Sequence, residues 1–256
     1  MALGVCNNLC KVAEGYPQYR TRTSCTFTNT NNDYVEVSAN SDFDCPTSDF
    51  SISGWVKFTA DASSTDDTDG YAIIDAGVFQ ATGWYLHYND AAGDDEQIIF
   101  KTNQEGSSDN CTMTGDLDHD IWYHFVATYD FSATTGKLYL DGALNKTASS
   151  QEAPITNSTN IYIGGSTTNE IPAIQCEIVY WKGVTLSAGQ VAGLYNNGRP
   201  RHGLSCERSY IKGYWKLNAA DATGSNNVVD SSGTGHHGTC GAAKSDGQFD
   251  TTDVPS

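Results

Sequence analysis

Hydrophobic and polar residues alternate in short runs along most of this chain, which is the pattern of β-strands. In residues 50–58 the side chains of Phe50, Ile52, Val56 and Phe58 share one face with Gly54. An aromatic-rich pair follows at residues 121–130 and 136–142, and its closing Asp-Gly predicts a tight hairpin turn into residues 143–147. Such a meander needs a second sheet to cover its apolar face, so the pattern predicts a sandwich.

Other stretches share this strand pattern. They are residues 26–28, 34–37, 71–74, 84–88, 97–101, 161–165, 174–181 and 210–217. The first two flank a turn-rich segment and predict a hairpin. Only residues 187–196 favour a helix, because Ser187 is a good N-cap, Gln190 completes a capping box and Gly198 follows the end. We therefore expect an all-β fold of roughly a dozen strands in two antiparallel sheets with one short helix.

Composition narrows the function classes. The 256 residues suffice for one large all-β domain, and no window approaches the 18 apolar residues of a membrane span. Fourteen basic against 31 acidic residues give a net charge of −17, which disfavours a nucleic-acid groove. The acidity fits either solubility in a salty medium or acidic loops that bind calcium. Residues 1–6 show neither a basic nor an apolar region, so we expect no signal peptide.

The chain has an even number of cysteines without the spacing of a zinc or redox motif. They are Cys6, Cys10, Cys25, Cys45, Cys111, Cys176, Cys206 and Cys240. One interpretation is a set of disulfides in an oxidising compartment: Cys6 and Cys10 could close a local loop, Cys25 and Cys45 bracket the predicted hairpin, and Cys206 and Cys240 bracket the C-terminal segment. The other is that several are free, buried small hydrophobes.

The order of these segments resembles laminin-G-like, concanavalin-A-like jelly rolls. The similar segments are residues 32–37, 50–56, 122–130, 138–142, 161–165 and 186–196, within residues 25–200. Residues 213–217 followed by 230–239, and the ending 252–256, are similar to the closing segment of such proteins in tailed phages and marine viruses. In the strand after the Gly-Gly turn the family often carries an Asp-Glu pair, whereas this chain has Cys176-Glu177.

The resemblance implies a two-sheet jelly-roll sandwich with a non-enzymatic role on a virion surface, in capsid decoration, as a fibre or in adhesion. We expect an extended N-terminal arm at 1–24, the jelly roll at 25–200, and a strand and loop segment at 201–256 that completes or decorates it. Capsid or other virion proteins, further copies of the chain and cell-surface glycans bound through loops are the expected partners, without nucleic acid or membrane insertion. The alternative is a secreted, extracellular lectin that binds carbohydrate, with or without calcium.

Catalytic chemistry is not expected. The Glu-x-Asp-x-x-Glu strand motif of similar hydrolases is missing, and Glu177 is interpreted as a rim or paired core carboxylate. His124 shares a strand face with Trp122 and is expected to be a packing residue rather than a metal ligand. The remaining titratable candidates are interpreted as turn or loop residues; they are Asp118, His119, Asp120, His236 and His237.

Loops offer weaker candidates for binding. Calcium could bind Asp66, Asp67 and Asp69, or Asp94, Asp95 and Glu96, although neither set matches an EF-hand and solvated turns explain both. Sugar binding could use Trp84, Tyr85, Tyr88 and Trp181, although core packing explains them equally well. Three sequons occur, at Asn110, Asn145 and Asn157, which is what chance gives in so Asn-, Ser- and Thr-rich a chain.

Overall fold

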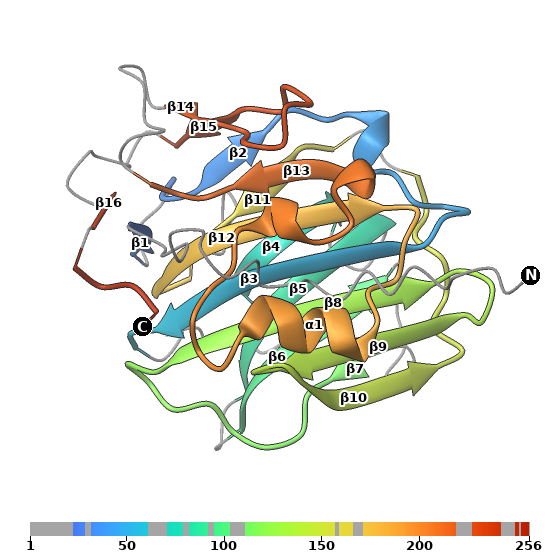
Figure 1. The fold of residues 1–256 in the computed structure, drawn as a ribbon, viewed down its shortest axis with the longest axis horizontal. Helices are drawn as coiled ribbons and strands as arrows, with labels where there is room; N and C mark the ends of the chain where they lie inside the picture. The colour runs from blue at the N-terminus through green and yellow to red at the C-terminus, as the bar shows by residue number, and fades with distance from the viewer. Residues whose placement is uncertain are drawn as a thin grey trace, which may run out of the picture.

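In the computed structural model two antiparallel sheets pack face to face as a sandwich (Figure 1). The structure describes residues 23–28, 32–60, 71–78, 82–91, 95–102, 111–156, 159–165, 171–218, 227–241, 249–250 and 252–255. The two-sheet architecture predicted from the alternating runs is confirmed.

The first sheet, called sheet A, carries the meander at one edge and the N-terminal strand near the other. In spatial order it contains β10 (Ala143–Ser149), β9 (Thr135–Leu140), β8 (Trp122–Asp130), β3 (Phe50–Phe58), β12 (Ala173–Lys182), β1 (Ser24–Phe27) and β16 (Phe249–Asp250). A further strand, β13 (Ile211–Trp215), pairs with β12 off this path.

The second sheet, called sheet B, lies behind sheet A in Figure 1. Its order is β14 (Asn227–Val228), β15 (Gly238–Cys240), β2 (Val35–Val37), β11 (Ile161–Ile163), β4 (Tyr71–Val78), β5 (Thr82–Ala91), β6 (Asp95–Thr102) and β7 (Cys111–Thr112). The segment after residue 200 therefore adds strands to both sheets.

The predicted meander forms β8, β9 and β10. Asp141 and Gly142 connect the last two strands with φ values of 48° and 80°. Positive φ at both central residues is the geometry of a type I′ turn, whose twist matches that of the flanking strands. This is why the local Asp-Gly sequence was sufficient to predict the hairpin.

The predicted helix is α1 (Ala188–Tyr195), which lies on the outer face of sheet A (Figure 1). Its capping box is complete: the Ser187 side chain accepts from the N–H of Gln190, and the Gln190 side chain accepts from the N–H of Ser187. The helix ends at Asn196 in the left-handed region rather than at a glycine. Within the described residues, no helix is long and apolar enough to cross a membrane.

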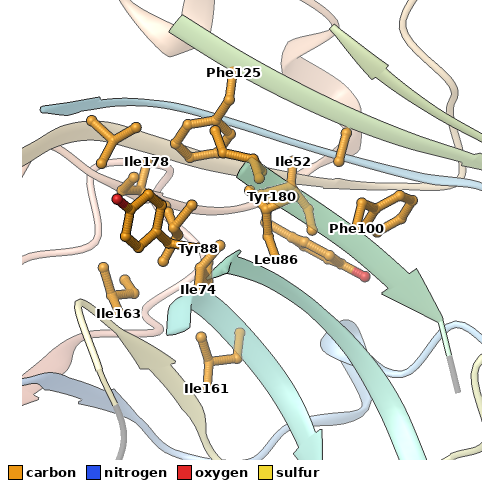
Figure 2. Close-up of a cluster of buried hydrophobic side chains, with 14 of the residues drawn as sticks. Ile52, Ile74, Leu86, Tyr88, Phe100, Phe125, Ile161, Ile163, Ile178 and Tyr180 are labelled. Carbon is orange, nitrogen blue, oxygen red and sulfur yellow. The ribbon is translucent and has the colours of Figure 1, made fainter. Parts of the chain in front are cut away.

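The main core fills the space between the two sheets (Figure 2). Ile178 and Phe125 contribute from sheet A, and Ile74 and Leu86 from sheet B; each is fully buried. At Gly54 an added Cβ would collide with Ile178 and with Phe125, 2.7 Å from its Cζ. The glycine at the centre of β3 thus lets two large side chains close over the strand.

A second cluster of buried residues lies on the outer side of sheet A, where α1 and two short 3-10 helices cover it. These are η3 (Gly203–Ser205) and η4 (Arg208–Tyr210), and a third, η1 (Ser41–Phe43), follows β2. Trp181 and Val179 of β12 pack here against Val191 and Leu194 of α1. The helix therefore has its own apolar contact surface.

The hairpin predicted from residues 26–28 and 34–37 is wrong. β1 pairs with β12 and β16 in sheet A, whereas β2 pairs with β11 and β15 in sheet B. The chain therefore changes sheet between β1 and β2, and just before β2 the Asp33 carboxylate accepts hydrogen bonds from the N–H and hydroxyl of Thr28. Turn composition does not reveal whether the chain returns to the same sheet.

The cysteine alternatives are resolved in part. Cys45 and Cys111 are buried, and burial raises the pKa of each thiol to about 11. Cys45 is a free thiol whose Sγ lies 2.7 Å from the Tyr180 hydroxyl, so it forms no disulfide with Cys25. Cys206 packs in the outer cluster and Cys240 in the main core, so these two are not partners either. Cys6 and Cys10 lie outside the described residues.

Candidate functional site

The outer face of sheet A is largely occupied by the chain itself. Trp55 and His124 point outward from β3 and β8, yet are only 3% and 2% exposed. Tyr195 of α1 packs against both, with its ring centroid 5.8 Å from Trp55 and 5.9 Å from His124. On the outer face of sheet B, Tyr85 and His87 are also buried, but Glu36, Tyr162 and Lys101 are partly exposed and can meet a ligand.

One continuous row of side chains crosses the outer face of sheet B. Pairing of six adjacent strands puts one residue of each into this row, which we call the outer row. Its members in order are Thr239, Glu36, Tyr162, Asp75, Tyr85 and Lys101. Because neighbouring strands are about 4.8 Å apart, the outer row spans roughly 24 Å. Polar, charged and aromatic groups thus alternate along a line perpendicular to the strands.

Tyr162 is the aromatic centre of the outer row. Its ring is partly exposed and stands edge-on to the ring of Tyr34, with the centroids 5.3 Å apart. Burial, and then the nearby Glu36 carboxylate, raise the pKa of Tyr162, so its hydroxyl stays protonated as a donor at neutral pH. The edge-on contact fixes the ring orientation.

Glu36 is held in place beside Tyr162. The side-chain amide of Asn160 donates to the Glu36 carboxylate, and the Asn160 carbonyl oxygen accepts from the N–H of Ala39 at 2.9 Å. Asn160 directly precedes β11 and Ala39 follows β2, so this bridge joins the ends of two paired strands. The carboxylate is therefore oriented before any ligand arrives.

Asp75 and His87 form a partly shielded pair next to Tyr85. Nε2 of His87 lies 3.7 Å from Oδ2 of Asp75, and the His87 ring centroid lies 4.5 Å from that of Tyr85. Burial raises the pKa of Asp75 despite the opposing effect of His87. The Asp75 side chain keeps 14% exposure, so Asp75 is a largely shielded member of the outer row, with His87 beside it on the same sheet face.

The sugar-binding candidates divide between the two faces of the strands. Trp84, Tyr88 and Trp181 are fully buried in the two clusters, as the core-packing alternative predicted. Tyr85 points outward on sheet B, although it is only 3% exposed. Sequence reasoning missed Tyr162, which had been assigned only to a strand.

The acid and imidazole candidates of sheet A are packing residues. His124 is buried and neutral, because burial lowers its pKa to about 3. Glu177 is 4% exposed, has a φ of 56° at an irregularity of β12, and accepts a hydrogen bond from the Tyr214 hydroxyl. The expectations of a packed histidine and a paired core carboxylate are confirmed.

The turn and loop candidates form local contacts. Asp118 and Asp120 lie in the turn before β8, where the Asp118 N–H donates to the Tyr123 hydroxyl at 2.9 Å. Nε2 of His119 lies 3.2 Å from Oε1 of Glu96. These contacts agree with the interpretation as turn residues.

Asp230 organises the loop that contains the two C-terminal histidines. Its carboxylate accepts from the backbone N–H groups of Tyr214, Ser232 and His236. His237 Nδ1 accepts from the Asp230 N–H at 3.1 Å, as expected of local turn bonding. His236 differs from the expectation, because its Nε2 reaches Oδ2 of Asp42, 3.1 Å away on η1.

Most of the calcium-binding candidates cannot be placed in the structure. Asp66, Asp67, Asp69 and Asp94 lie outside them, and the side chain of Asp95 is not described. Within the described part, no cluster of three or more histidine, cysteine or acidic side chains could hold a metal ion.

One sequon can be placed. The Asn145 side chain is bonded to the backbone of Thr114 in both directions, accepting at 2.8 Å and donating at 3.2 Å. Asn110 and Asn157 lie outside the described residues.

Comparison with known proteins decides the family. Residues 29–192 match the family model Laminin_G_3, described as concanavalin A-like lectin/glucanases superfamily. The chain belongs to this superfamily. Among curated proteins, no sequence matches the chain.

Solved structures agree on the fold of this concanavalin A-like protein. A protein from Bacteroides ovatus ATCC 8483, to which carbohydrate binding is ascribed, superposes with a TM-score of 0.66 at 18% identity. The match covers 93% of this chain and 62% of that protein, so this chain spans less than two thirds of its length. A heptameric SAP-like pentraxin from Limulus polyphemus has a TM-score of 0.50 at 11% identity, covering 69% of this chain and 83% of the pentraxin.

Proposed function

We propose that this concanavalin A-like domain is a non-catalytic glycan-binding module whose binding surface is the outer face of sheet B. The observation that carries the proposal is the outer row, with Tyr162 between Glu36 and Asp75. Sugar rings present an apolar face to an aromatic ring and hydroxyls to carboxylates, amides and ammonium groups. Row members Glu36, Tyr162 and Lys101 are all partly exposed.

The chemistry of the face favours neutral over anionic glycans. Two of its charged groups, Glu36 and Asp75, are carboxylates, and the chain carries a net charge of −17. An acidic sugar would meet repulsion from both. The carbohydrate binding ascribed to the Bacteroides ovatus protein supports a carbohydrate as the ligand.

Display on a virion surface and assembly into homo-oligomers stay predictions from the sequence, as does the extracellular alternative. Binding glycans through the sheet face is compatible with either location. The proposal concerns the site and its ligand class.

A glycan array probed with the full chain tests the proposal. We expect binding to neutral oligosaccharides that is about tenfold weaker in Tyr162→Ala. Repeating the array with a chelator separates a calcium-dependent lectin from the sheet-face site proposed here, which needs no metal ion. No binding to any glycan, or release of reducing sugar from a bound one, would overturn a non-catalytic binding role.

A further inference from the structure

A carboxylate near the C-terminus is bound on the outer face of sheet A. The side chain of Asp253 contacts the ammonium of Lys57 and accepts a hydrogen bond from Nε1 of Trp122 at 3.1 Å. The same ammonium lies 5.9 Å from the centroid of the Trp122 ring. Ionised partners make such bonds stronger than neutral ones. Lys57 and Trp122 thus form a carboxylate receptor.

The backbone around Asp253 is recognised as well. β16 pairs antiparallel with β1, with Ser24 opposite Asp250 and Cys25 opposite Phe249. The Ser24 hydroxyl donates to the carbonyl oxygen of Asp253 at 2.6 Å. We call residues 249–250 and 252–255 the docking segment. It is held by strand addition and by an acidic anchor, two common modes of peptide recognition.

Apolar contacts complete this recognition. Phe249 packs against the main core while keeping partial exposure, and Pro255 is buried. The acidic anchor stays near the surface, since the side chains of Asp253 and Lys57 are 31% and 12% exposed. Departure of the docking segment would expose Phe249 and Pro255, and a segment from a second copy would bury the same contacts again.

Departure of the docking segment would expose a strand edge. β1 lies between β12 and β16, so without β16 it becomes the last strand of sheet A (Figure 1). An edge strand with unpaired N–H and C=O groups is a template for another strand. A docking segment from a second copy can pair with this edge of β1 and make the same contacts.

We propose that the docking segment binds β1 and the Lys57–Trp122 receptor in trans as well as in cis, so that two copies of the chain associate by exchanging it. The partner is a second copy, because its segment supplies the same strand pair, carboxylate and apolar anchors. Exchange of identical elements adds no unpaired group and is a low-cost route to dimers.

Two single cysteine variants test the exchange. Ser24 and Asp250 are opposite in the β1–β16 ladder, where Cα atoms lie about 5 Å apart, within disulfide range. Ser24→Cys and Asp250→Cys chains, one carrying a size tag, are mixed at high concentration, oxidised and analysed on a non-reducing gel. We expect a covalent heterodimer of tagged and untagged chains.

Two controls identify the receptor. Adding Lys57→Met to the Ser24→Cys chain removes the ammonium but keeps most of the side-chain length, and we expect about tenfold less heterodimer. A synthetic peptide of residues 249–255 should compete, whereas the same peptide with Asn at position 253 should compete less.

The double variant Ser24→Cys/Asp250→Cys, oxidised in dilute solution, checks the register within one chain. An intrachain disulfide there combined with no heterodimer in the mixture would overturn exchange. Absence of the intrachain disulfide would overturn the docking geometry itself. A heterodimer that persists unchanged with Lys57→Met would overturn the role of the receptor.

Discussion

On the outer face of sheet B, Nε2 of His87 lies 3.7 Å from Oδ2 of Asp75, a member of the outer row proposed to bind glycans. Burial raises the pKa of Asp75 above 3.8, because the ionised carboxylate is poorly solvated in the folded protein. The free energy of unfolding therefore falls as pH rises from 3.8 through the folded-state pKa. We expect Asp75→Asn to unfold at pH 7 at the same temperature as the wild type or higher. A large loss of thermal stability in calorimetry would mean that the His87 contact outweighs the cost of burial.

Acid should destabilise the protein through His124. Burial lowers the folded-state pKa of His124 to about 3, whereas its pKa in the unfolded chain is 6.5. The unfolded chain therefore binds a proton at this residue more readily than the folded protein, and the free energy of unfolding falls steadily as pH drops from 6.5 towards 3. Between pH 7 and pH 5 this group alone should remove about 2 kcal/mol from the free energy of unfolding. Denaturant unfolding at both pH values checks this, with His124→Asn as the non-titrating variant. An unchanged pH dependence in that variant would contradict the account.

Gly54→Ala should be strongly destabilising, because its Cβ would enter the space of Phe125 and Ile178 (Figure 2). Overpacking of a dense core costs about 1–3 kcal/mol. Gly189→Ala in α1 is the matched control, since nothing lies within 4 Å of its added Cβ. Chemical denaturation compares the two, and equal stability of both variants would show that the core yields at this point.

Asp230→Ala should release the loop that it organises. Its carboxylate accepts from backbone groups of Tyr214, Ser232 and His236, and these donors would lose their partner. We expect a loss of about 3 kcal/mol in the free energy of unfolding. The hydrogen bonds lower the pKa of Asp230 even though burial, the largest influence, raises it. The stabilisation should therefore persist above pH 3.8 and be lost as pH falls below it, which acid titration of wild type and variant would measure.

Local signals made much of the fold predictable. The capping box of Ser187 and Gln190 and the Asp141-Gly142 turn depend on neighbours within a few residues, and both formed as expected. The strand at 50–58 was predicted with its observed bounds because its alternation is uninterrupted.

Relationships between distant residues could not be predicted in the same way. The path from β1 to β2 changes sheet, which depends on partners such as Ile174 and Ile161 more than 120 residues away. Asp253 meets Lys57 across 196 residues of sequence. No local pattern encodes either contact.

The residues of the candidate site could not be identified from the sequence for a related reason. In β5 both faces carry large side chains, so period-two alternation separates Trp84 and Tyr88 from Tyr85 without showing which set faces the core. Tyr162 occupies a strand of three residues, too short for its orientation to be read. Only sheet pairing puts it between Glu36 and Asp75.

Titration calorimetry with a neutral oligosaccharide selected on the array tests the central claim most directly. The wild type is compared with Tyr162→Ala and with Tyr210→Ala, a 41% exposed tyrosine of η4 beside sheet A. We predict about tenfold weaker binding for Tyr162→Ala, from loss of the aromatic contact, and unchanged binding for Tyr210→Ala. Wild-type affinity in a folded Tyr162→Ala protein would contradict a binding site on the outer face of sheet B.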